Sequence, residues 1–206
     1  MSIKKNFGAV IKLKTISNFL GKGFFLALLS SQTQASDRLY EAIGERLSLM
    51  QEVAAYKFKN NLPIQSNERE SKVIDMAIQA GLGQRITRDS LRKVFQTQIE
   101  AAREIQSCWF DKFSNMTSLP ETSNLTQVIR PKIEALGKKI VKYIPAHVTN
   151  YESFISHVDI ECLSDRSKFR IFTALQRVSF YRSSLWFTLY CASINDLTHG
   201  ATALRL

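Results

Sequence analysis

Two cationic residues lie on what should be the apolar face of a helix. Arg46 and Lys57 are 11 residues apart, so at 3.6 residues per turn their side chains leave a helix within about 20° of each other. Leu39 and Val53, each seven residues from Arg46, point in nearly the same direction. Because an unpaired buried cation is costly, an anion should meet these two side chains. The alternative is that both side chains reach along the apolar face to solvent or to nearby glutamates.

A third cation, Arg69, belongs to the same pattern. It stands at the start of the next predicted helix, where free backbone N–H groups also favour an anion. Three positive groups and a helix N-terminus together predict a binding site for a small, negatively charged ligand.

The elements that must position these residues are helices. Only 8 glycines and 4 prolines interrupt the 206 residues, and apolar residues recur at helical spacing. Pro131 should be the first residue of a helix or a kink in it. We expect an all-α bundle of about six helices with no β-sheet. The pattern predicts helices at about 36–60, 66–81, 87–113 and 125–144, with one or two more within 148–195.

The first 35 residues have the features of a secretory signal peptide. They contain five lysines and no acidic residue, then an apolar run at 24–29, then small and polar residues ending at Ala35. We expect cleavage near Ala35 and a mature protein in the periplasm or outside the cell; the alternative is a soluble N-terminal helix or a disordered arm. The apolar run is too short to cross a bilayer, so we expect no stable membrane insertion. The mature domain, 36–206, would then consist of helices at 36–114, a linker at 115–123 and a C-terminal helical part at 124–206.

The charge of the chain does not favour a nucleic-acid partner. The formal net charge is +10, but without the leader 28 − 5 = 23 basic residues face 18 acidic ones, a net of +5. Polyanion binding would use exposed clusters of cations, whereas Arg46 and Lys57 are predicted to point inward. The modest excess suits an enzyme with an anionic substrate.

Three cysteines and three histidines complete the reactive residues. Cys162 and Cys191 could close a loop of about 30 residues in an oxidising compartment, which leaves Cys108 without a partner. The alternative is that Cys162 and Cys191 are buried thiols. The histidines lack metal-ligand spacing, so no metal site is predicted.

Five short motifs lie within residues 37–113. They are Glu45-Arg46-Leu47, Val53-Ala54-Ala55-Tyr56-Lys57, Leu62-Pro63-Ile64, Glu68-Arg69-Glu70, and the run from Val94 to Gln106. These motifs resemble, in register and in a specific combination of spacings, those of the helical, AroQ-class chorismate mutases. The leader, the longer C-terminal part and the pair of Cys162 and Cys191 resemble the exported gamma subclass.

The resemblance implies a chorismate mutase type II fold and an isomerase that rearranges chorismate to prephenate in aromatic amino acid (Phe/Tyr) biosynthesis. It also implies a homodimer without a cofactor. Such an enzyme selects the compact conformer of its substrate and stabilises charge on the breaking ether oxygen. By analogy, Arg46 pairs with a carboxylate, and Lys57 and Gln106 donate hydrogen bonds to the ether oxygen. Arg69 adds positive field, and Glu70 accepts from the ring hydroxyl. The alternatives are that Glu70 only caps its helix and that Gln106 is a core-edge amide bonded to backbone.

A second carboxylate contact is implied on the later helix of the same chain. Lys139 stands at that position, with Lys138 or Arg130 as alternatives if the register slips. Lysine lacks the bidentate fork of arginine. Ser66 and Ala102 replace an acidic and a hydroxyl residue that are common in the family, and both changes would weaken hydrogen bonding to the substrate.

Two other functions stay open at this stage. Isochorismate pyruvate lyases share the scaffold and the three cations, although the exported type of C-terminal half favours the mutase. A non-enzymatic, secreted helical interaction protein is the other alternative. The joint presence of the five polar site residues argues against it.

Overall fold

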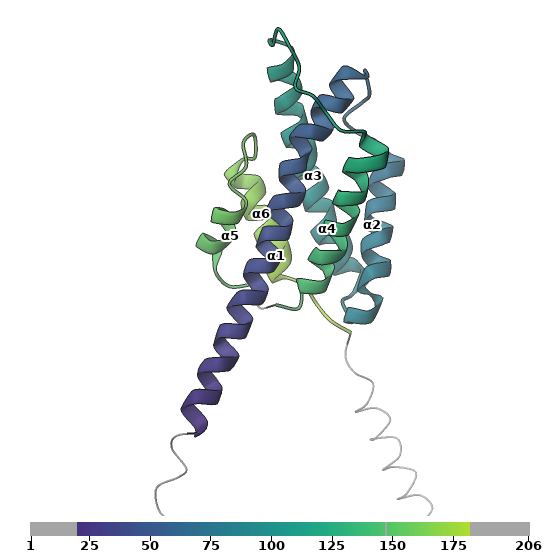
Figure 1. Cartoon of the computed structure of the whole chain (residues 1–206). Helices are drawn as coiled ribbons and strands as arrows, with labels where there is room; N and C mark the ends of the chain where they lie inside the picture. Colours follow the sequence, from purple (N-terminus) through teal and green to yellow (C-terminus); the bar gives the residue numbers. More distant parts are fainter. Residues whose placement is uncertain (1–19, 147, 182–206) are drawn as a thin grey trace, which may run out of the picture.

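Six α-helices form a bundle in the computed structural model, which describes the backbone of residues 20–146 and 148–181 and the side chains from residue 34 on. Helices α1 to α4 lie side by side, and α5 and α6 cover the flank of α1 and α3 that faces away from α2 (Figure 1). Within these residues the only β pairing is an isolated bridge between Ile86 and Phe180, so the all-α prediction is confirmed. The helices are α1 (Leu20–Lys59), α2 (Asn67–Gly81), α3 (Arg88–Phe113), α4 (Arg130–Tyr143), α5 (Tyr151–His157) and α6 (Asp165–Gln176).

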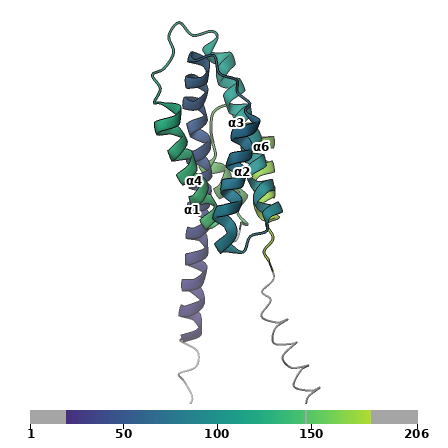
Figure 2. The same cartoon turned by 90° about the vertical axis from the view of Figure 1, so that its right-hand side faces the viewer.

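Helix α1 is longer than the sequence predicted. It begins at Leu20 rather than near Ser36, and its N-terminal part extends beyond the rest of the bundle (Figure 2). No proline or glycine stands between residues 24 and 36, so nothing in the sequence breaks the helix at the predicted start. The first described buried side chains of α1 are those of Ser36 and Leu39. Among the described side chains of α1, burial therefore begins directly after the predicted cleavage point.

The next two helices begin and end close to the predicted residues because their caps are local. The Ser66 hydroxyl accepts from the backbone N–H of Arg69 at the start of α2, and the Thr87 hydroxyl accepts from that of Ser90 at the start of α3. The 3-10 turn η1 (Leu82–Gln84) joins the two helices. The Ser66 cap fixes where α2 begins and therefore places Arg69 in its first turn.

A π-helical turn, η2 (Leu125–Ile129), precedes α4. The Asn124 side chain caps it by accepting from the backbone N–H groups of Thr126 and Gln127. Pro131 then lies in the first turn of α4, where its missing N–H costs nothing; the prediction for Pro131 is confirmed. Because a π turn holds more residues than an α turn, it changes which side chains of α4 face α1.

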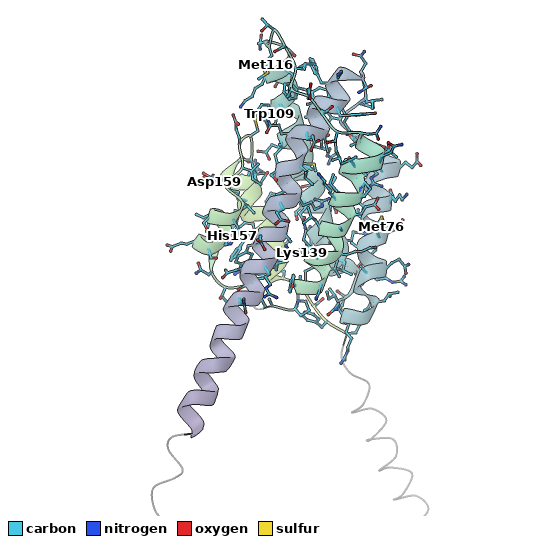
Figure 3. The ribbon with its side chains drawn as sticks, in the orientation of Figure 1. Met76, Trp109, Met116, Lys139, His157 and Asp159 are labelled. Carbon is cyan, nitrogen blue, oxygen red and sulfur yellow. A yellow bond between two sulfur atoms is a disulfide. The ribbon has the colours of Figure 1, made fainter. Side chains whose placement is uncertain are left out.

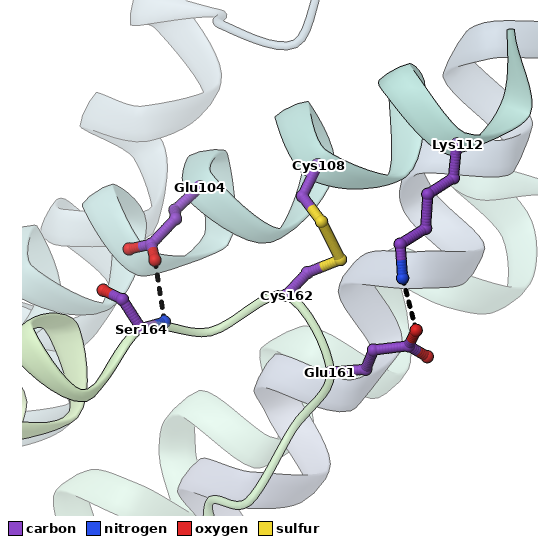
Figure 4. Close-up of a disulfide and its surroundings, with 6 residues drawn as sticks. All are labelled: Glu104, Cys108, Lys112, Glu161, Cys162 and Ser164. Atoms are coloured by element: carbon purple, nitrogen blue, oxygen red, sulfur yellow. Dashed lines mark hydrogen bonds and ion pairs between the residues drawn. A yellow bond between two sulfur atoms is a disulfide. The ribbon is translucent and has the colours of Figure 1, made fainter.

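A disulfide joins α3 to the loop between α5 and α6. It links Cys108 to Cys162 (Figure 4), so the predicted pairing of Cys162 with Cys191 is wrong; Cys191 lies outside the described residues. Next to the bond, Lys112 pairs with Glu161, and the Glu104 carboxylate accepts from the backbone N–H of Ser164 at 2.8 Å. Sequence spacing favoured the shorter loop, but the packing of α6 on α3 brings Cys162 to Cys108.

We expect a peptide linked through Cys108 and Cys162 in a non-reducing digest of the oxidised protein. The bond closes a loop with a sequence separation of 54 residues, so the chain-entropy relation gives a loss of about 4 kcal/mol of unfolding free energy on reduction. Peptide mass mapping and urea unfolding with and without reductant measure both effects. A linked Cys162–Cys191 peptide would contradict this pairing.

The core lies between α1, α3 and α4 and continues under α5 and α6. Tyr40, Phe95 and Phe154 are its largest fully buried side chains, and Tyr40 meets Phe154 edge to face with ring centroids 5.4 Å apart. Among the described helices, none has the length and apolar content that a membrane crossing requires.

Candidate active site

A cavity of about 240 Å³ opens between α1, α2, α3 and the start of α4. Its polar lining includes five residues that the sequence singled out as site candidates, and they come from three helices. Apolar side chains such as Val53, Ile99 and Ile133 fill the wall between them. The five predicted residues in the lining are Arg46, Lys57, Arg69, Glu70 and Gln106.

Arg46 is the most deeply buried cation of the cavity, with only 3% of its surface exposed. Its Nη1 donates to Oε1 of the fully buried Gln98 at 3.4 Å, and its guanidinium carbon lies 5.8 Å from the centre of the Phe95 ring. Its Nε has no hydrogen-bond partner among the described residues. Burial, and then the positive charge of Arg69, lower the pKa of Arg46 to about 10. A buried guanidinium with an unused donor is prepared for an anion.

Lys57 also lines the cavity, close to the loop between α1 and α2. Its Nζ donates to the backbone carbonyl of Ile64 at 2.6 Å, which leaves further ammonium hydrogens for a ligand. Burial lowers the pKa of Lys57 to about 8; the positive charge of Arg130 acts in the same direction, and the Glu70 carboxylate opposes it. Lys57 is therefore a cation whose charge changes near neutral to mildly alkaline pH.

The Gln106 amide is anchored to its own helix. Its Nε2 donates to the backbone carbonyl of Ala102 at 2.9 Å and lies 3.8 Å from the sulfur of Met50, and its Oε1 is buried without a hydrogen-bond partner in the described part of the chain. The backbone bond is the arrangement that the sequence analysis kept as the alternative to a catalytic role. Because a thioether is a weak acceptor, a ligand oxygen can replace Met50 as the partner of the second N–H.

Two ion pairs involve side chains that line the cavity. Nη2 of Arg69 lies 2.8 Å from Oε1 of Glu134 on α4, and Nε of Arg103 lies 3.9 Å from Oε1 of Glu70. Since Ser66 caps α2, Glu70 is not needed as the cap and lines the cavity instead. The sequence analysis missed Arg103; its place next to Ala102 on the cavity face of α3 was the available signal.

The structure places Lys139 outside this cavity. Its Nζ lies 3.4 Å from Oε2 of Glu41 and 3.9 Å from Oε1 of Glu45, both on α1, and it sits on the α1 side of α4 (Figure 3). Arg130, in the first turn of α4, lines the cavity instead. Lys138 borders a separate, smaller cavity of about 20 Å³. Of the three residues predicted as candidates for the second carboxylate contact, Arg130 is the one that lines this cavity.

The cavity is strongly positive. Five cations line it against one carboxylate, that of Glu70, and the arrangement suits a compact ligand with two negative charges. Among the residues that the structure describes, those lining the cavity include no cysteine, no serine–histidine pair and no cluster of metal ligands. The five cations are Arg46, Lys57, Arg69, Arg103 and Arg130.

Comparison with known proteins finds chorismate mutases. Residues 31–107 match the family model of type II chorismate mutases. A secreted chorismate mutase of Yersinia pestis is 29% identical over 170 residues, covering 77% of this chain and 89% of that protein. One from Mycobacterium tuberculosis is 28% identical over 149 residues, with 71% and 72% covered. The crystal structure of the secreted Yersinia pestis enzyme superposes with a TM-score of 0.66 at 25% identity, covering 70% of this chain and 98% of that one.

Fold and site together define an all-helical protein with an internal polycationic pocket for a small anion. In sequence and in structure, the chain is similar to type II chorismate mutases.

Proposed function

We propose that this protein is a chorismate mutase that converts chorismate to prephenate. The observation that carries the proposal is the cavity itself, in which α1 and α2 bring Arg46, Lys57 and Arg69 together around about 240 Å³. The match of residues 31–107 to the type II chorismate mutase model and the names of the relatives support the same activity.

The reaction needs no nucleophile or base, because one C–O bond breaks while one C–C bond forms within a single molecule. The protein can accelerate it by holding the compact conformer of the dianion and by stabilising the charge that grows on the ether oxygen. The apolar wall of Val53, Ile99 and Ile133 limits the space for extended conformers. The cations of the cavity supply the positive electrostatic field that stabilises the charge on the ether oxygen.

We assign the substrate contacts as follows. Arg46, with its unused Nε, binds one carboxylate, and Arg130 binds the second. Lys57 and the second N–H of Gln106 donate to the ether oxygen, while Glu70 accepts from the ring hydroxyl. Arg69 supports the negative charge of the substrate from the mouth of the cavity.

The first experiment is a turnover assay on the mature protein, expressed with its own leader and purified from the periplasm. Prephenate formation from chorismate is the expected result. Pyruvate release from isochorismate would select the lyase, and a well-folded helical protein that turns over neither compound would rule out the enzyme.

Activity should fall at alkaline pH. Lys57 must be protonated to donate to the ether oxygen, and its pKa in the empty cavity is about 8. Below that pH the ammonium is present, and above it kcat/KM should drop about tenfold per pH unit. The bound dianion favours the charged form, so kcat should hold to higher pH than kcat/KM. Profiles of both from pH 6 to 10 test this; a kcat/KM that stays flat to pH 10 would exclude Lys57 as the donor.

We further propose that the protein acts outside the cytosol. The relatives in Yersinia pestis and Mycobacterium tuberculosis are named as secreted, and a disulfide suits an oxidising compartment. Cleavage near Ala35 would leave the packed part of α1 intact. N-terminal sequencing of the periplasmic protein locates the cut, and sedimentation equilibrium tests the homodimer.

A further inference from the structure

One carboxylate holds a site cation across two helices. Arg69 leaves the first turns of α2, and Glu134 leaves α4 one turn after Arg130. Their 2.8 Å ion pair is partly shielded, with 21% and 32% of the two side chains exposed. Shielding matters because an ion pair in full solvent contributes little.

Glu134 lines the smaller of the two neighbouring cavities and lies next to residues that line the larger one. It lines the smaller cavity together with Arg46, while its partner Arg69 and its neighbour Ile133 line the larger one. The positive charge of Arg69 already lowers the pKa of Arg46, so the two cations repel each other. A carboxylate on Arg69 offsets part of that repulsion while no anion is bound.

The pair also limits the freedom of the arginine. A free arginine side chain carries about 2 kcal/mol of rotamer entropy, and the start of α2 lies next to solvent, into which Arg69 could otherwise turn. Because Glu134 holds the Arg69 guanidinium at the cavity wall, substrate binding costs less side-chain entropy of Arg69.

We propose that Glu134 is a positioning residue of the active site, which holds the Arg69 guanidinium at the cavity wall. It acts through Arg69 and not on the substrate itself. The inference rests on the proposed mutase function.

A double-mutant cycle tests this role in the mature protein purified from the periplasm. Because Glu134 acts through Arg69, Glu134→Ala should lower kcat/KM roughly tenfold in the wild-type background, within the range of coupled neighbours. The same change should have an effect of about twofold or less in the Arg69→Ala background. Glu134→Gln, which keeps an acceptor, should recover part of the loss. The loss should appear in KM more than in kcat, because an Arg69 side chain that is no longer held must be ordered when the substrate binds.

Glu41→Ala is the matched control. It breaks a carboxylate–cation pair between α1 and α4, that of Glu41 with Lys139, outside the cavity, and should leave kcat/KM unchanged. A purely structural role for Glu134 predicts equal losses in both Arg69 backgrounds. Equal losses, or an unchanged Glu134→Ala variant, would overturn the inference.

Wild-type turnover is measured first, so that failure of the proposed function is separate from failure of the inference. The same cycle is also measured as prephenate affinity by titration calorimetry, which needs no turnover. Coupling of Glu134 and Arg69 in prephenate affinity supports the positioning role even in an inactive protein. A wild-type protein that neither turns over chorismate nor binds prephenate contradicts both proposals.

Discussion

Lys57→Ala should lower kcat for the conversion of chorismate to prephenate by on the order of 10²–10³-fold, the usual effect of removing one donor to a developing oxyanion. Charge grows on the ether oxygen only as the C–O bond breaks, so the ammonium acts more strongly on the transition state than on the bound substrate. KM should therefore change much less than kcat. Steady-state kinetics on the purified variant give both values.

Lys59→Ala is the control for this change. Lys59 stands two residues further along α1 and is exposed, so its removal alters the charge of the protein by the same amount without touching the cavity. It should retain wild-type kcat. Circular dichroism has to show an intact bundle for Lys57→Ala, because the variant also loses the bond to the Ile64 carbonyl. A folded Lys57→Ala protein with wild-type kcat would remove Lys57 from the mechanism.

The sequence was sufficient where structure is decided locally. Helices α2 and α3 have their own caps, Ser66 and Thr87, and helical periodicity alone places Arg46 and Lys57 on one face of α1. The direction of that face then follows from burial of the apolar stripe. Arg69 joins the two because α2 begins soon after α1 ends. These relations need only short-range geometry, so they could be predicted.

Long-range geometry could not be predicted in the same way. The choice between Lys139 and Arg130 depends on how many residues the turn before α4 contains, and the π-helical turn η2 is not visible in apolar spacing. The disulfide of Cys108 depends on α6 packing against α3. Both are properties of packed helices and not of any single segment.

The start of α1 shows a different limit. Ser36 and Asp37 are good cap residues, but a cap stabilises a helix start only where the preceding chain leaves the helix. In the full chain the residues before Ser36 continue the helix to Leu20. Removal of the predicted leader would make Ser36 the first residue of the chain, so the helix start depends on processing.

Arg46→Met should make the unliganded protein more stable and nearly inactive. A buried cation without a full set of partners is costly, and an apolar side chain of similar length removes that cost. The Oε1 of Gln98 then loses the donor Arg46, and this loss of a buried hydrogen bond offsets part of the gain in unfolding free energy. We expect a net increase of about 1 kcal/mol in the free energy of unfolding. Urea unfolding of the ligand-free protein measures it.

The same change should lower kcat/KM by roughly 30- to 5,000-fold, since truncating one partner of a buried charge pair costs about 2–5 kcal/mol. The kcat/KM of Arg46→Lys should lie between those of the wild type and Arg46→Met, because lysine keeps the charge but not the planar fork of arginine. Arg92→Met is the control on the exposed side of α3, where Arg92 pairs with Asp89. It should change the free energy of unfolding by about 0.5 kcal/mol or less and leave turnover intact. If Arg46→Met destabilised the free protein by several kcal/mol, Arg46 would be a structural cation that Gln98 and Phe95 satisfy. A gain in stability with loss of turnover would show that its burial serves the bound anion.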